Sequence, residues 1–356
     1  MFNILDRYIS KIIFYNVIIT LLMLISLSSI IKFIDQLRKI GQGTYTTVKA
    51  EFFTLLSIPK DIEIFLPMSV LIGTLIGLGQ LSTYNELIIM QASGFTRMQI
   101  SKSVVKTAIP FILIIMIISE WIVPYSDKIA HNFRLQQLYN NSLLSIKNKL
   151  WIKDKNDFIY IDHINTKNEI FGINIYHFNH LGNLETIRYA NTANFKNKIW
   201  ILSKVNNFHL INKKKIINKK KLLDEWKTNL TPEEIILTTL NPNSISIKKI
   251  YHYIQYLKHN NQNTKYYQLN LWKKIFSPFS IIVMMLMALS CVFGPLQSIS
   301  INIRILIGII LGLLCYSLNK IFGQLGLIYN LPPLLNVILP NIIFFVFSIY
   351  MLLKKT

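Results

Sequence analysis

Six long apolar runs constrain this chain more than any other feature of its sequence. A helix needs about 20 apolar residues to cross the hydrocarbon core of a bilayer. The runs of this length are 12–34, 62–82, 104–124, 272–293, 303–322 and 333–353. Three lie toward the N-terminus and three toward the C-terminus, and a polar block, roughly 127–268, separates them. We therefore predict a membrane protein with three spans, a soluble domain and three more spans.

The composition favours a membrane protein over a nucleic-acid-binding one. Hydrophobic residues make up 52% of the chain and charged residues 15%, although the formal net charge is +21. Lysine, asparagine and isoleucine occur in spans and loops alike, so we interpret the charge mainly as compositional bias. Attraction to anionic partners is the alternative. The two cysteines, Cys291 and Cys315, lie in apolar runs and predict no disulfide framework.

The polar block alternates between apolar and polar residues with a period of two, which is typical of short strands. The clearest segments are FIYIDHI (158–164), IFGINIYHF (170–178), ETIRYANTANF (185–195) and KIWILSKVNNFHL (198–210). A domain of such strands predicts a sandwich, jelly roll or barrel. We interpret KKKIINKKK (213–221) as a solvated hairpin end, with steering of lipid phosphates as the alternative.

The short loops predict which membrane face carries the termini. An even number of spans places both termini on one side, and cytoplasmic loops are enriched in lysine and arginine. The terminal side carries Arg7, Lys11, Arg97, Lys102, Arg304, Lys354 and Lys355, against Arg38, Lys39, Lys49 and Lys60 on the other side. This bias favours cytoplasmic termini and a soluble domain outside the inner membrane.

A short amphipathic stretch, TYNELIIMQASGFTRMQ (83–99), separates the second and third runs. Thr83 and Glu86 have the spacing of a capping box, which predicts a helix that starts at Tyr84, and Gly94 is a natural helix stop. One interpretation is a helix on the membrane surface with Glu86 used in its own cap. The other is a helix that docks into a cytoplasmic partner through its acidic residue. The residues alone leave both interpretations open.

Eight separated segments, in order along nearly the whole chain, resemble one family of membrane proteins. They are LDRYI (5–9), SLSSIIKFIDQL (26–37), LLSIPKDIEIFLPM (55–68), ELIIMQASGFTRMQ (86–99), TAIP (107–110), WKTNLTP (226–232), YQLNLWKKIFSP (267–278) and MMLMALSCVFGPL (284–296). They resemble the LptF/LptG permeases of lipopolysaccharide export. The Ala-Ser-Gly segment after the second run is closer to the LptG branch than to the LptF branch.

The resemblance implies an α-helical membrane protein with six transmembrane helices. An all-β periplasmic jelly-roll domain would be inserted between helices 3 and 4. The implied parts are an N-terminal membrane half (1–126), the jelly roll (127–268) and a C-terminal membrane half (269–356). Such a protein would be a multi-pass component of the bacterial inner membrane, with both termini in the cytoplasm.

The resemblance also implies a non-catalytic permease subunit of an ATP-driven transporter that extracts lipopolysaccharide and passes it to a periplasmic bridge. The implied partners are an LptF permease, a dimer of the LptB ATPase, LptC and, through an open edge of the jelly roll, LptA. The short helix, about 84–94, would be the coupling helix, with Glu86, Leu87, Met90 and Gly94 as coupling residues. The chain has no G-x-x-x-x-G-K-[ST] motif, so we expect a partner to bind ATP. We expect no cofactor or metal on this chain.

A lipopolysaccharide exporter needs an apolar cavity and cations near its outer rim, because the lipid has many acyl chains and a phosphorylated head. Lys32 lies near the outer end of the first run, where a charge is costly unless it snorkels or is paired. A purely structural role predicts Asp35 as its partner. The resemblance implies lipid contacts from Lys32, Arg38, Lys39, His131 and Arg134. His131 stands where the family has an arginine, so we expect weaker phosphate contact there or a substituting lysine.

Two features inside the runs have open roles. Gly73 and Gly77 form a G-x-x-x-G pattern, which predicts close helix packing within the chain or, alternatively, a moving helix contact. Glu120 lies near the outer end of the third run. Its role is either to pair with a basic residue or to orient a loop, and the sequence favours neither.

Three alternatives compete with the LptG-type permease. The first is an LptF-like subunit of the same transporter. The second is a membrane-bound enzyme that modifies lipid A or a glycan, for which Asp127, His131, Asp154, Asp157, Asp162 and His163 lie in the right region but form no motif that we can identify. The third is a channel-like or scaffolding protein, which would not need a cytoplasmic docking helix.

Overall fold

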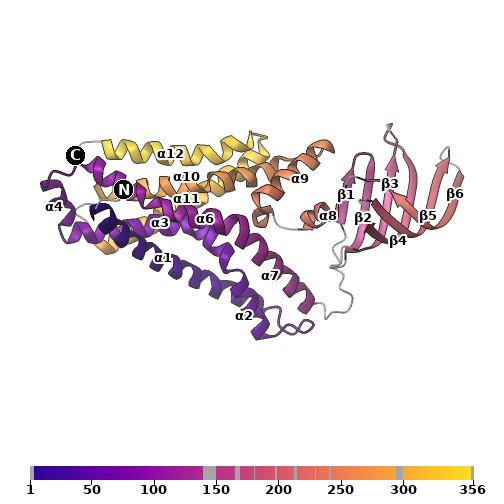
Figure 1. Cartoon of the computed structure of the whole chain (residues 1–356), viewed down its shortest axis with the longest axis horizontal. Coiled ribbons are helices and arrows are strands. Elements are labelled where there is room, and N and C mark those ends of the chain that lie inside the picture. Colours follow the sequence, from indigo (N-terminus) through magenta and orange to yellow (C-terminus); the bar gives the residue numbers. More distant parts are fainter. Residues whose placement is uncertain are drawn as a thin grey trace.

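The computed structural model describes residues 4–138, 150–164, 169–179, 181–196, 199–211, 215–228, 230–239, 242–293 and 300–353. Long helices form a bundle, and an antiparallel sheet lies at one end of it (Figure 1). Both ends of the chain lie near the opposite end of the bundle, beside the short helix α4 (Glu86–Ala92).

The described part of the chain contains 6 helical segments that are long and apolar enough to cross a membrane, and each contains one predicted run. Five are single helices: α1 (Ile4–Leu37), α3 (Ile58–Thr83), α10 (Lys265–Phe293), α11 (Ile301–Ile328) and α12 (Pro333–Leu353). The third span is composite and consists of α5 (Arg97–Lys106), α6 (Ala108–Ile117), a π-helical turn (Ile118–Ile122) and α7 (Val123–Leu138). The six predicted spans are therefore confirmed.

Helix α3 forms the centre of the bundle. In its most apolar stretch 61% of the residues are buried inside the chain, against 17% for α1 and for α11. A Cβ atom at Gly73 would lie 2.5 Å from the Cα of Val17, so α1 packs directly on α3 at this glycine. This contact confirms the close packing that the G-x-x-x-G pattern predicts. Helices α1 and α11 leave large apolar surfaces to lipid or to another protein.

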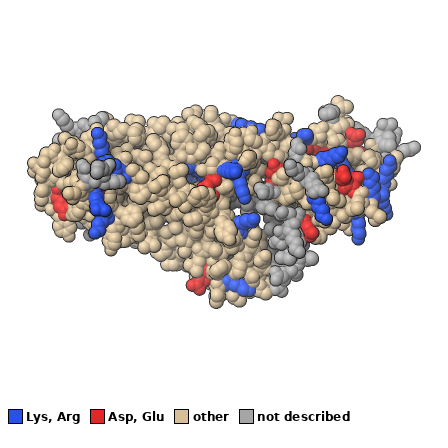
Figure 2. All heavy atoms as spheres, viewed as in Figure 1, with Lys and Arg blue, Asp and Glu red and all other residues tan. Residues whose placement is uncertain are grey.

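Charged side chains mark the two ends of the helical bundle. On the face shown in Figure 2, lysines and arginines gather at the end near α4, and charged residues appear again toward the sheet. Mostly uncharged surface separates the two groups. This distribution fits a belt of lipid around the middle of the bundle.

The sheet contains six described strands in the order β1–β2–β3–β4–β5–β6, all antiparallel. They are β1 (Leu150–Asp154), β2 (Asp157–Ile164), β3 (Ile170–Phe178), β4 (Leu184–Lys196), β5 (Ile199–Ile211) and β6 (Lys215–Trp226). Strands β2 to β5 match the four predicted segments, and β1 and β6 were missed. Residues 215–221, expected at a solvated hairpin end, belong to β6, whereas residues 213 and 214 lie outside the described part.

The sheet has an apolar core of its own. Trp200 and Trp226, on neighbouring strands, are almost fully buried beside residues of α8 (Pro232–Thr239) and α9 (Ile247–His259). The Nε1–H of Trp200 donates to the carbonyl oxygen of Leu230 at 2.8 Å. The strands predicted from the period-two pattern are therefore confirmed, but α8 and α9 pack against the sheet, so this part of the chain is not all-β.

Candidate functional site

Lys32 is paired with an acidic residue, but not with the one expected. Its Nζ lies 2.5 Å from Oδ1 of Asp61, in the first turn of α3. The Asp61 side chain is 2% exposed and that of Lys32 is 31% exposed. The expected pairing with Asp35 is wrong, because α3 presents a buried carboxylate at the same depth. The pair therefore ties the end of α1 that lies nearer the sheet to α3, with Lys32 still partly open to solvent.

A basic group lies where α1 leaves the bundle and meets α7. Burial and the positive charge of Arg134 lower the pKa of Lys39, and the negative charge of Asp35 opposes this shift. Arg134 also lies over the ring of Phe53, with its Cζ 4.8 Å from the ring centroid. Two cations that are held close enough to lower a lysine pKa form a favourable environment for an anion.

The loop between α1 and α2 (Thr47–Leu56) is fixed against α7 by polar contacts. The backbone N–H of Thr44 donates to the carbonyl oxygen of Gln137 at 2.9 Å, and Lys49 Nζ donates to Gln137 Oε1 at 2.5 Å. Phe52 and Phe133 add an edge-to-face contact. These contacts bring the residues after α1 beside the residues of α7.

The remaining expected lipid contacts divide between the same two segments. Arg38 is exposed at the end of α1. His131 lies on α7 one turn before Arg134 and is half-buried. The structure therefore brings Lys39 and Arg134 together and places Arg38 and His131 on the elements that carry them. Among the described residues, Lys32 is the one of the five that is engaged in an ion pair with a buried acid.

A buried polar cluster deeper in the bundle was missed by sequence analysis. Lys274 on α10 lies 3.4 Å from Oε1 of Glu63 and donates to the backbone and side-chain oxygens of Ser119, both at 3.2 Å. The Ser119 hydroxyl in turn donates to Glu63 Oε1 at 2.6 Å. Ser119 belongs to the π-helical turn, which widens the helix locally and makes its carbonyl accessible to Lys274. The available signal was charged residues inside apolar runs, which are rarely without a role.

Two further contacts connect the spans to the segment that returns from the sheet. The backbone N–H of Ile247, the first residue of α9, donates to Oε2 of Glu120 at 2.8 Å. Lys60 Nζ contacts Oδ1 of Asp127 at 3.1 Å and the Ser244 hydroxyl at 2.9 Å. Glu120 therefore orients the segment that returns from the sheet, by accepting a hydrogen bond at the start of α9.

The short helix α4 begins and ends differently from the expectation. Helix α3 continues to Thr83, whose hydroxyl donates to the carbonyl oxygen of Gly79, so the capping box with Glu86 is wrong. The helix starts at Glu86 rather than at Tyr84. Gly94 follows the helix with a φ of +92°, which confirms it as the stop.

The expected coupling residues occupy different environments. The carboxylate of Glu86 accepts hydrogen bonds from the Tyr8 hydroxyl at 2.9 and 3.1 Å, which joins α4 to α1. Leu87 and Met90 are buried in the core of the helical bundle. Ile88 and Ile89 are more than half exposed and form the outward surface of α4. Leu87 and Met90 therefore anchor the helix, and its free surface is apolar.

Comparison with known proteins places this architecture in a family. Residues 7–354 match the family model "Lipopolysaccharide export system permease LptF/LptG". The chain is 48% identical to the lipopolysaccharide export system permease protein LptG of Escherichia coli (strain K12), across 100% of this chain and 99% of the relative. It is 41% identical to the LptG protein of Haemophilus influenzae, with the same coverage. The chain therefore belongs to the LptF/LptG family of lipopolysaccharide export system permeases.

Proposed function

We propose that this chain is the LptG-type permease subunit of an ATP-driven exporter of lipopolysaccharide in the bacterial inner membrane. The observation that carries the proposal is its full-length similarity to proteins named LptG. The basic group around Lys39 and Arg134, at the end of the apolar spans nearest the sheet, supports it. An apolar bundle that ends in cations suits a lipid with acyl chains and phosphates.

The proposed orientation has both termini and α4 in the cytoplasm and the sheet in the periplasm. The bias of basic residues in short loops supports it. The position of both termini beside α4, away from the sheet, agrees with an even number of spans (Figure 1). The proposed parts are the membrane halves 1–126 and 269–356 and a jelly-roll domain, 127–268, although α7 and α10 each cross one of these boundaries.

The surfaces that the chain leaves open suit the proposed partners. The exposed apolar faces of α1 and α11 suit an LptF permease, and the outward face of α4 suits an LptB dimer. Strands β1 and β6 are the outer strands among those described, and β6 exposes Leu222 and Leu223. An edge strand of this kind can continue a sheet into LptC or LptA.

The contacts of α4 and α1 suggest how motion of the ATPase would reach the lipid. Closure of the ATPase below would displace α4, and Glu86 would transmit this motion to Tyr8 on α1. Helix α1 continues without a break to Leu37, so the motion reaches Lys32 and the basic group beside it. Lys32, Arg38, Lys39, His131 and Arg134 would hold the lipid phosphates there before the lipid passes to the sheet.

The competing readings are less well supported. The relatives named above are called LptG, which favours that branch over LptF. The family match favours a transporter component over a membrane-bound enzyme, and three of the candidate acids have partners within the described part of the chain. Asp127 contacts Lys60, Asp154 accepts a hydrogen bond from Thr228, and Asp157 lies 2.5 Å from His177 Nδ1.

A photocrosslinking experiment in native membranes tests the permease assignment. A photoreactive residue at Ile88, on the exposed face of α4, should form an adduct with a soluble nucleotide-binding subunit. The same residue at the buried Met90 is the matched control and should form none. If Ile88 forms no such adduct in a correctly inserted protein, α4 is a surface anchor and the proposal is wrong.

A further inference from the structure

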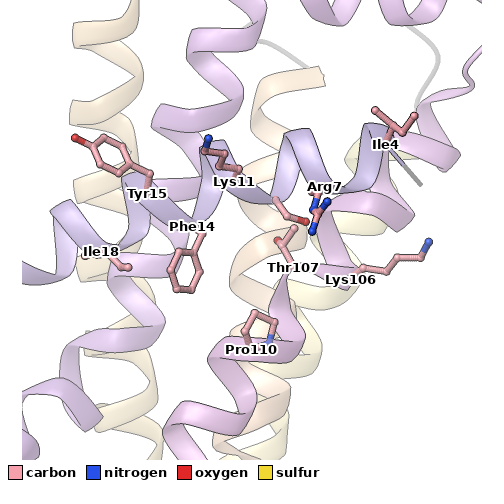
Figure 3. A pocket seen from close by; sticks show the side chains of 10 residues that line it. Ile4, Arg7, Lys11, Phe14, Tyr15, Ile18, Lys106, Thr107 and Pro110 are labelled. Carbon is pink, nitrogen blue, oxygen red and sulfur yellow. The ribbon is translucent and has the colours of Figure 1, made fainter. Parts of the chain in front are cut away.

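An amphipathic cavity lies at the end of the bundle opposite the sheet. It has a volume of about 1060 Å³, just above the roughly 300–1,000 Å³ range of small-molecule sites. It lies between the first turns of α1 and the junction of α5 and α6 (Figure 3). The lining residues are Ile4, Arg7, Ser10, Lys11, Phe14, Tyr15, Ile18, Lys106, Thr107 and Pro110.

The cations of this cavity are not equivalent. Lys106 Nζ lies 2.7 Å from Oδ2 of Asp6, whose other oxygen accepts a hydrogen bond from Ser103. Arg7 and Lys11 are exposed, and within the described part of the chain no acidic side chain lies within ion-pairing distance of either. The cavity therefore offers two unneutralised cations, one turn apart on α1.

The rest of the lining suits an amphipathic ligand. Phe14 stacks on Phe111 at 5.2 Å between ring centroids, and Figure 3 shows Phe14 on the Pro110 side of the cavity. The Ser10 hydroxyl oxygen is buried and has no hydrogen-bond partner among the described residues. Because an unsatisfied buried hydroxyl is costly, it fits a site that a ligand oxygen completes.

The cavity lies at the level of lipid head groups. With a rise of 1.5 Å per residue, Arg7 and Lys32 lie roughly 38 Å apart along α1. A bilayer with its head-group regions is about 40–45 Å thick. Arg7 and Lys32 therefore lie near opposite surfaces of the membrane, and the cavity faces the leaflet on the side of the N-terminus.

We propose that this cavity binds one anionic glycerophospholipid from that leaflet. Arg7 and Lys11 bind the phosphate, the Ser10 hydroxyl donates to a phosphate or ester oxygen, and an acyl chain lies along Phe14 and Ile18. Basic pockets between transmembrane helices are suited to such head groups. A zwitterionic lipid is disfavoured because its own cation would lie beside Arg7 and Lys11. This site goes beyond the proposed export function and is separate from the basic group near the sheet.

The test titrates the detergent-solubilised, full-length protein, with any permease partner that copurifies, and counts bound lipids by native mass spectrometry. The probes are phosphatidylglycerol, phosphatidylcholine as the zwitterionic lipid, and glycerol phosphate as the head group without acyl chains. Arg7→Gln/Lys11→Gln removes the two cations. Arg97→Gln/Lys102→Gln is the matched control, with the same charge loss on α5 but outside the cavity. Arg7→Lys/Lys11→Arg keeps the charge.

The proposal expects one tightly held phosphatidylglycerol per chain. Arg7→Gln/Lys11→Gln should weaken its binding at least about tenfold, as expected for the loss of a charged hydrogen bond. The control pair and the charge-conserving pair should bind as the parent protein does, and neither phosphatidylcholine nor glycerol phosphate should compete. Equal losses in the two Gln pairs, or equal binding of phosphatidylcholine, would overturn the proposal. Displacement of the lipid by a copurifying permease would also overturn it and assign the cavity to a protein interface.

Discussion

At the scale of single residues, the cations nearest the sheet fall into two kinds. Lys32 is neutralised by the buried Asp61, whereas Arg134 lies close enough to Lys39 to lower the pKa of its amine. Sequence reasoning chose Asp35 as the partner of Lys32 because residues three apart on a helix are neighbours. Asp61 lies 29 residues away on another helix, and no local rule could have identified it.

The pair of Lys32 and Asp61 predicts a stability effect that is separate from lipid binding. Lys32→Ala should lower the free energy of unfolding by about 1–3 kcal/mol, less than for a fully buried pair because Lys32 is partly exposed. Lys32→Ala/Asp61→Asn should recover part of this loss, because the uncompensated carboxylate is gone. Thermal unfolding in detergent measures both variants, with Arg38→Ala as the control. Unchanged stability in Lys32→Ala would contradict a stabilising role for this pair.

The lowered pKa of Lys39 predicts its chemical reactivity. Burial and the charge of Arg134 favour the neutral amine of Lys39 in the folded protein. At a pH below the folded pKa, the protonated Lys39 therefore destabilises the folded state relative to the unfolded state. This penalty is relieved as the pH rises through that pKa toward the ordinary value of 10.5. Arg134→Gln should raise the pKa of Lys39, so that less of its amine is neutral at pH 9. Acylation of Lys39 at that pH should therefore be several-fold slower. Peptide mapping by mass spectrometry, with Lys102 as the internal reference, measures the rate.

An added anion sharpens this experiment. Lipopolysaccharide bound at the basic group stabilises the protonated amine, so it should also slow acylation of Lys39 in the parent protein. Faster acylation in Arg134→Gln, or no protection by lipopolysaccharide, would contradict the placement of these two cations around a phosphate.

At the scale of elements, short sequence motifs predict a helix start correctly only where tertiary packing does not override them. A capping box does occur near α4, but between Thr96 and Gln99 at the start of α5. Thr83 and Glu86 have the same spacing, yet α3 extends through Thr83 because its apolar face remains packed. Strand β6 was missed because its lysines and its exposed Leu222 and Leu223 break the period-two pattern. Pairing with β5, rather than intrinsic pattern, makes it a strand.

The contact between α1 and α3 predicts different outcomes for two neighbouring glycines. A Cβ at Gly73 would lie 2.5 Å from the Val17 backbone, whereas at Gly77 the nearest atoms lie at 3.4 Å. Gly73→Ala should therefore force the helices apart and cost about 1–3 kcal/mol. Gly77→Ala should be close to neutral, since alanine favours the helix by up to about 1 kcal/mol. Thermal unfolding of the two purified variants compares them directly. Equal effects would mean that the two helices do not pack as closely as described.

At the scale of the whole molecule, the number of spans and the presence of a β-sheet between the two groups of spans could be predicted, because length and period are properties of the sequence alone. The connections between these parts could not. Glu120 accepts from Ile247, Lys60 contacts Asp127 and Ser244, and Lys274 reaches Glu63. Each contact joins residues that are far apart in the chain. Together they join the spans to one another and to the segment that returns from the sheet.

The most direct test of lipopolysaccharide export by this chain is a photocrosslink from Ile40 in native membranes. Ile40 is partly exposed and follows Lys39, so a photoreactive residue there reports on the basic group without removing any cation. We predict a lipopolysaccharide adduct that Arg134→Gln diminishes and that is absent from position 88 on α4. No lipopolysaccharide adduct at position 40, in a protein whose position 88 still crosslinks to the ATPase, would contradict lipid binding at this group.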